Sequence, residues 1–254
     1  MSRLDPRLLL QCYAAGIFPM ADSRDAAELF WVEPRNRAII PLERFHMSRS
    51  LRRTIRSGRF NVTRDRDFVG VIAACADREE TWINQEIESA MLALHSSGHA
   101  HSIEVWHPGD RGQQLVGGVY GVRLGHAFFG ESMFSTMTDA SKVALAWLVA
   151  RLKVGGFTLL DCQFMTAHLA SLGAVSVPRD DYVALLSAAL GGGSAAGVGT
   201  ASSAGAGLAA PDGSRVAGAP ADFLALDRLL DATGAAGTPG PAGYVIAQLL
   251  GQTS

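Results

Sequence analysis

The sequence predicts an α+β fold, with a small N-terminal domain followed by a mixed sheet with flanking helices. Two features of the pattern support this prediction. Over residues 84–96 the apolar side chains Ile87, Met91 and Leu94 recur at helical spacing and share one face. From residue 100 the period changes to that of strands, and three candidate strands follow one another with short turns between them. A helical region that leads into consecutive strands is typical of the α+β class.

The N-terminal domain is expected over residues 1–78 and should contain short elements. Its first helix is predicted at 5–15, with Asp5 as the N-cap and Pro6 at the first helical position. The elements predicted after it are a strand at 37–40, a helix at 48–56 that Ser48 can cap, a strand at 60–63 and a helix at 67–76.

The second domain is expected over residues 79–190. After the helix at 84–96, the pattern predicts strands at 100–106, 114–123 and 126–133, a helix at 141–152, a strand at 157–161, a short helix at 166–172, a strand at 174–177 and a helix at 180–190. This order is similar to that of GNAT-like (acetyltransferase-like) cores, which is an analogy of fold alone. Because residues 135–141 contain no glycine for a pyrophosphate loop, we expect no coenzyme A.

Composition limits the classes of function. The chain has 254 residues, 48% hydrophobic, with a net charge of −2, so any surface that binds nucleic acid must be a local basic patch. Three cysteines without a CxxC motif indicate neither a disulfide framework nor a zinc ribbon, which fits a reducing cytoplasm. The apolar runs are too short to cross a membrane.

The composition changes near residue 190. Residues 191–221 are mostly Gly, Ala and Ser without an apolar period, and we interpret them as a flexible insertion. In the C-terminal tail, 222–254, two short apolar pieces at 222–230 and 244–250 are expected to dock back as short elements.

The strongest functional signal is a series of motifs in a fixed order between residues 8 and 185. The motifs are AAGIFP at 14–19, SRSLR at 48–52, TWI at 81–83, AHS at 100–102, EVW at 104–106, LVGG at 115–118, GESMFS at 130–135, ASK at 140–142, DCQ at 161–163 and HLASLGA at 168–174, together with Trp31, Pro34 and Arg35. Together they resemble the leucyl/phenylalanyl-tRNA–protein transferases. The chain departs from the family pattern at Phe30-Trp31, where a tryptophan pair is usual, and in four extra residues near 108–111.

The resemblance implies transfer of Leu, Phe or Met from aminoacyl-tRNA to proteins that begin with Arg or Lys, which marks these proteins for N-end-rule degradation. It implies no metal and no cofactor, and we expect a monomer in the cytoplasm. An alternative of a different class is a non-catalytic tRNA- or RNA-binding module on a GNAT-like core. A binding module would have no need for the full set of Glu131, Asp161 and Gln163.

Asp161, Gln163 and Glu131 are the candidate catalytic residues. At the end of a buried strand, Asp161 and Gln163 should leave the same face, so that Asp161 accepts the side-chain N–H of Gln163 and Gln163 positions the attacking amine. The alternative is a polar pair that caps the next helix. Glu131, beside Phe128 and Phe129, can bind an ammonium group or have a raised pKa, or it can be a solvated turn carboxylate.

Aromatic and apolar side chains are candidates for binding the terminal adenosine and the aminoacyl side chain. These residues are Trp31, Trp82, Phe128, Phe134 and Val119, and the alternative for each is ordinary core packing. Four arginines share one face of the predicted helix at 48–56 and could bind the tRNA backbone, or could form an ordinary solvated face: Arg49, Arg52, Arg53 and Arg56. Four histidines could suggest a metal site, but without a nearby carboxylate or cysteine we expect none: His95, His99, His101 and His107.

Overall fold

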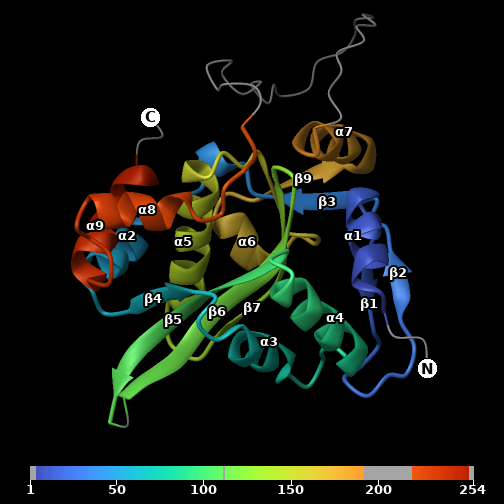
Figure 1. The fold of residues 1–254 in the computed structure, drawn as a ribbon, viewed down its shortest axis with the longest axis horizontal. Helices are drawn as coiled ribbons and strands as arrows, with labels where there is room; N and C mark the ends of the chain where they lie inside the picture. Colours follow the sequence, from blue (N-terminus) through green and yellow to red (C-terminus); the bar gives the residue numbers. More distant parts are fainter. Residues whose placement is uncertain (1–3, 111, 192–218, 252–254) are drawn as a thin grey trace, which may run out of the picture.

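The computed structural model describes residues 4–110, 112–191 and 219–251, so most of the predicted insertion at 191–221 lies outside the described residues. A seven-stranded sheet occupies the centre of the molecule, in the order β4-β5-β6-β7-β8-β3-β9 (Figure 1). All neighbouring strands are antiparallel except β7 and β8, which are parallel. The strands are β3 (Asn36–Ile39), β4 (Asn61–Arg64), β5 (Ala100–Gly109), β6 (Gly112–Leu124), β7 (Ala127–Ser135), β8 (Leu159–Asp161) and β9 (Val175–Pro178). The α+β prediction is confirmed.

Strands β5, β6 and β7 form the long central meander. A bulge interrupts the pairing of β6 with β7: Tyr120 pairs with Ser132 and Gly121 pairs with Gly130, which leaves Glu131 without a residue opposite it. Gly121 is required here, because a Cβ at this position would lie 2.2 Å from the carbonyl oxygen of Phe129. Bulges change the direction in which a side chain points, and this one determines the direction of Glu131.

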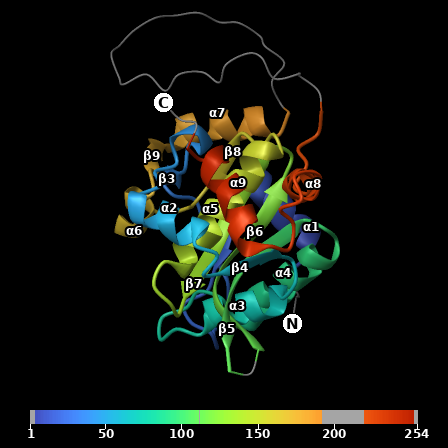
Figure 2. The same ribbon diagram turned by 90° about the vertical axis from the view of Figure 1, so that its left-hand side faces the viewer.

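Helices cover both faces of the sheet (Figures 1 and 2). On one face α5 (Ala140–Val154) packs against the central strands and forms a core with α2 (Arg49–Arg56), α8 (Ala225–Ala232) and α9 (Pro239–Leu249). On the other face α3 (Phe68–Ala76) and α4 (Gln85–Ser96) form a second core with α1 (Pro6–Ala14). No helix among the described residues is both long and apolar enough to cross a membrane.

Most predicted helices are confirmed, and so are the two predicted caps, Asp5 and Ser48. The side chains of Asp5, Ser48, Asp67 and Asn84 each accept a hydrogen bond from a backbone N–H in the first turn of the helix that follows. Helices α6 (Ala167–Ser171) and α7 (Arg179–Ala189) also lie where they were predicted. The order of elements from α4 to α7 is the predicted GNAT-like order.

Three short elements were missed by the sequence analysis. They are β1 (Phe18–Met20) and β2 (Phe30–Val32), which form a separate two-stranded sheet, and the 3-10 turn η1 (Leu42–Arg44). Each has three residues, and β1 contains a proline, which argues against a strand when only the sequence is known. Strands β3 and β4 lie before residue 78 but belong to the same sheet as β5–β9, and the division into domains stays a prediction.

Candidate active site

The three candidate catalytic residues lie together at one edge of the second core. Glu131 lies on β7, Asp161 is the last residue of β8, and Gln163 follows two residues later. All three are buried, with exposed fractions of 7%, 0% and 6%. The Gln163 side-chain nitrogen Nε2 donates a hydrogen bond to Glu131 Oε1 at 2.9 Å. The cluster can therefore present a carboxylate and an amide to a single bound group.

The predicted contact between the Asp161 carboxylate and the Gln163 side chain is wrong. The backbone N–H of Gln163 donates to Asp161 Oδ1 at 2.8 Å, and the side-chain amide turns to Glu131 instead. The strand ends at Asp161 and Gln163 has a φ of 61°, so the alternation of an extended strand does not continue through these residues. The capping alternative is also wrong, because Thr166 caps α6 through its hydroxyl.

Two residues that the sequence analysis missed hold the other side of Asp161. Arg37 on β3 is 1% exposed, and its Nε lies 3.0 Å from both carboxylate oxygens. The Tyr182 hydroxyl, from α7, donates to Asp161 Oδ2 at 2.8 Å. The available signal was an arginine within a strand of otherwise apolar character, because a guanidinium is rarely buried without an acidic partner.

Glu131 is a buried carboxyl group rather than a solvated one. Burial, reinforced by the negative charge of Asp161, raises its pKa from 4.5 to about 7. The buried hydroxyl of Tyr13 interacts with Glu131 and opposes part of that rise in pKa. Within the described residues, Glu131 Oε2 has no other donor. A buried carboxylate with so few donors is costly, and a bound ammonium group would supply further ones.

The candidate aromatic residues are distributed over both faces of the sheet. Trp31 on β2 is 42% exposed, and Trp82 and Phe134 are half-buried against the second core. In contrast, Phe128 and Val119 are buried in the first core, under α5. There the Phe128 ring stacks on Phe223, with 5.5 Å between ring centroids. The structure thus places Phe128 and Val119 among core side chains rather than beside the polar cluster.

The four arginines of α2 are exposed, and none of them has an ion-pair partner within the described part of the chain. Helix α9 packs against α2 from behind, and the Arg56 guanidinium lies over the Tyr244 ring, 4.2 Å from its centroid. This arrangement leaves a basic helix face open to solvent.

Two of the four candidate histidines, His95 and His101, make polar contacts within the fold. His101 contacts Asp65 at 2.8 Å through Nδ1, and Nδ1 of His95 lies 2.9 Å from the carbonyl oxygen of Ala100. Among the described residues, no group of three or more His, Cys, Asp or Glu side chains is placed to hold a metal ion.

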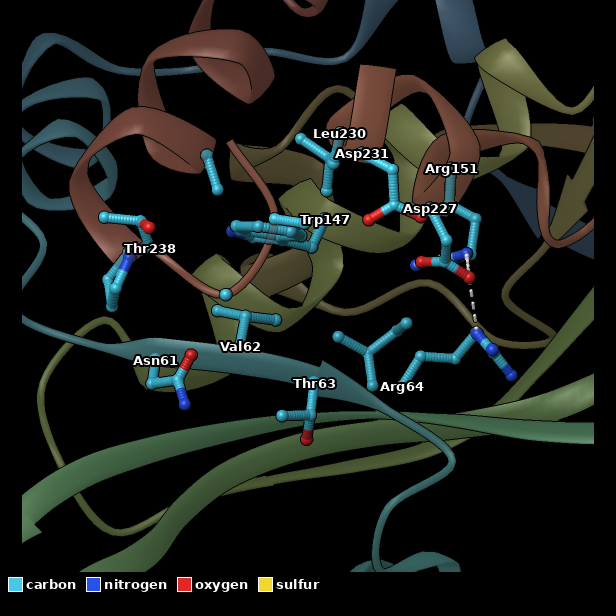
Figure 3. A pocket seen from close by; sticks show the side chains of 15 residues that line it. Asn61, Val62, Thr63, Arg64, Trp147, Arg151, Asp227, Leu230, Asp231 and Thr238 are labelled. Carbon is cyan, nitrogen blue, oxygen red and sulfur yellow. Dashed lines mark hydrogen bonds and ion pairs between the residues drawn. The ribbon is translucent and has the colours of Figure 1, made fainter. Parts of the chain in front are cut away.

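A cavity of about 140 Å³ lies between β4, α5 and the two C-terminal helices (Figure 3). On its wall the Asp227 carboxylate bridges the guanidinium groups of Arg64 and Arg151. The cavity is lined by none of the candidate catalytic residues, and it marks the seam where the C-terminal tail joins the sheet.

A GNAT-like order of elements, with a buried carboxylate at the bulge of β7 beside an amide that follows the end of β8, fits an acyl-group transferase. Comparison with known proteins makes the class specific. The family model for leucyl/phenylalanyl-tRNA protein transferase matches residues 39–187, and the model for its N-terminal domain matches residues 2–35. The chain therefore belongs to the leucyl/phenylalanyl-tRNA protein transferase family.

Individual relatives agree with this assignment. The leucyl/phenylalanyl-tRNA–protein transferase of Rhizorhabdus wittichii is 58% identical over 259 residues, which covers 100% of both chains. That of Zymomonas mobilis is 59% identical and covers 74% of this chain and 70% of the relative.

Among solved structures, the crystal structure of FemX aligns with a TM-score of 0.46 and 10% identity, over 67% of this chain and 66% of that chain.

Proposed function

We propose that this protein transfers a leucyl or phenylalanyl group from aminoacyl-tRNA to the N-terminal amine of proteins that begin with Arg or Lys. We include methionyl-tRNA as a further donor. The new peptide bond marks the acceptor for N-end-rule degradation. We propose that the enzyme acts as a monomer in the cytoplasm and needs no cofactor. The observation that carries the proposal is the buried, hydrogen-bonded pair of Glu131 and Gln163, whose carboxylate and amide oxygens can accept hydrogen bonds from an amine.

In the proposed reaction the acceptor amine attacks the ester carbonyl of the aminoacyl-tRNA. A C–N bond forms, the C–O ester bond breaks, and one amine proton ends on the released ribose oxygen. Gln163 donates its Nε2–H to Glu131, and its Oε1 accepts no hydrogen bond from the residues that the structure describes, so this oxygen can orient the amine. Glu131, with a pKa of about 7, is suited to take up the amine proton near neutral pH. Because the ester is already activated, orientation supplies much of the rate.

We assign the tRNA backbone to the basic face of α2, formed by Arg49, Arg52, Arg53 and Arg56, because these side chains are exposed and lack ion-pair partners within the described residues. Trp31 is exposed enough to stack on the terminal adenine. Trp82 and Phe134 stay predicted contacts of the adenosine and the aminoacyl side chain, whereas Phe128 and Val119 lie in the first core, under α5.

The test is incubation of the protein with radiolabelled Leu-tRNA and a peptide that begins with Arg. We expect label in the peptide. The same peptide with an acetylated N-terminus should stay unlabelled, because its amine is blocked, and a peptide that begins with Ser should be labelled poorly. A protein that shifts tRNA in a gel but leaves every peptide unlabelled would instead be the non-catalytic tRNA-binding module.

A further inference from the structure

The Asp161 carboxylate is surrounded by donors. Both of its oxygens lie 3.0 Å from Arg37 Nε, and Oδ2 also lies 2.9 Å from an Arg37 Nη. Oδ1 also accepts the backbone N–H of Gln163, and Oδ2 accepts the Tyr182 hydroxyl. Both oxygens of Asp161 are thus occupied within the protein, so this carboxylate is poorly placed to receive a proton from a substrate.

Arg37 is itself held rigidly. Its guanidinium lies between two rings, 4.7 Å from the centroid of Phe18 and 4.6 Å from that of Tyr182. One Nη donates to the carbonyl oxygen of Gly16 at 3.1 Å. Burial raises the pKa of Tyr182, which keeps its hydroxyl protonated as a donor. An arginine fixed on three sides can hold a carboxylate in one orientation.

This arrangement stabilises the backbone conformation of Gln163. Its φ of 61° lies in the left-handed region, which is unfavourable for an L residue other than glycine. Two hydrogen bonds hold this conformation: the Gln163 N–H donates to Asp161, and the Gln163 carbonyl accepts the N–H of Ala38 at 3.0 Å. Arg37 and Ala38 are consecutive residues of β3, so one strand secures both sides of the Gln163 backbone.

We propose that Arg37 and Tyr182 are positioning residues for the transfer reaction, because they fix Asp161 and thereby hold Gln163 in the left-handed conformation that aims its amide at Glu131. Asp161 then acts on the backbone of Gln163 and not on its side chain. The kinetic part of this inference rests on the proposed function, whereas the conformational part does not.

The principal test is Tyr182→Phe, which removes one oxygen from the cluster. Hydrogen exchange of the Gln163 backbone amide should become at least about tenfold faster, since its acceptor is no longer held on both sides. Amides of β7 and α5 should keep their protection. The single-turnover rate of transfer should also fall about tenfold. The Michaelis constant for aminoacyl-tRNA, measured at steady state, should stay within about twofold of wild type.

Arg37→Lys keeps the charge but loses the planar fork, and it should give the same two effects more strongly. Arg151→Lys is the matched control, because Arg151 is also buried and paired with an aspartate, Asp227, but lies at the seam with the tail. That control should leave both Gln163 readouts near wild type, even where it lowers stability.

Unchanged exchange at Gln163 in a folded Tyr182→Phe protein would overturn the proposal, whether or not Arg37→Lys folds. Faster exchange with an unchanged transfer rate would overturn its kinetic part. If the wild-type protein transfers nothing to any peptide, the proposed function fails, while the exchange measurement still decides the conformational claim.

Discussion

Replacement of Glu131 by glutamine should change how the stability of this protein depends on pH. The pKa of Glu131 is raised from 4.5 to about 7 in the folded protein, because burial disfavours the carboxylate. Below pH 4.5 the carboxyl group is protonated in both the folded and the unfolded chain. Between pH 4.5 and 7 only the folded chain keeps the proton, so stability is lost progressively as the pH rises through this window.

The size of the effect follows from the same values. Over the interval from 4.5 to about 7, at about 1.36 kcal/mol per pH unit, Glu131 should cost the folded state on the order of 3 kcal/mol. In the Glu131→Gln protein the side chain is neutral at every pH, and its amide oxygen can still accept the Gln163 N–H. The variant should therefore gain about 3 kcal/mol relative to wild type between pH 4 and pH 8.

Urea unfolding of both proteins at a series of pH values measures this difference in stability directly. Because the two proteins share all other titrating groups, the contribution of those groups cancels in the difference. Glu80→Gln, which removes a charge from an exposed position, is the control for the loss of one surface carboxylate. A stability difference between wild type and Glu131→Gln that stays constant from pH 4 to pH 8 would refute the argument.

Three further predictions concern activity and the tail. The single-turnover rate of the wild type should rise with pH through about 7, as Glu131 loses its proton, and a flat profile from pH 6 to pH 8 would remove Glu131 as the proton acceptor. Charge reversal at Arg49 and Arg53 should weaken tRNA binding and reduce the slope of log affinity against log salt by roughly 0.9 per lost phosphate contact, measured by filter binding; an unchanged slope rules the basic face out. Phe223→Ala should lower the free energy of unfolding by about 3–5 kcal/mol, because this 2% exposed ring joins the tail to the first core, and a loss below 1 kcal/mol would show that the tail contributes little to that core.

Local patterns predicted most elements, because their signals lie within a few residues. The helix that follows Asn84 illustrates this, because its apolar side chains Ile87, Met91 and Leu94 recur at helical spacing and all three are buried in the structure. The membership of Glu131, Asp161 and Gln163 in one cluster came from the family resemblance. How they contact one another could not be predicted, because that depends on a backbone angle at Gln163 and a bulge at Glu131.

Contacts between residues far apart in the sequence could not be predicted either. Arg37 and Asp161 are 124 residues apart in the sequence, and nothing near Arg37 indicates which carboxylate it meets. Similarly, Phe128 is followed by another phenylalanine, and the sequence cannot tell which of the two faces the core under α5. The structure separates them, with Phe128 in the first core and Phe129 in the second.

The position of β3 has a consequence for the order of folding. This strand leaves the ribosome early, but its neighbours β8 and β9 are synthesised more than 100 residues later. Until residue 161 has been made, the apolar run from Ala38 to Ile40 has no strand on either side, and until residue 178 it lacks one of its two neighbours. Such unpaired strands are prone to aggregate. Closing a sheet through contacts this distant in sequence is slow. The half of the sheet that carries Asp161 is therefore expected to form last, so that a nascent chain becomes competent for catalysis only after Tyr182, the last residue that contacts Asp161, has been synthesised.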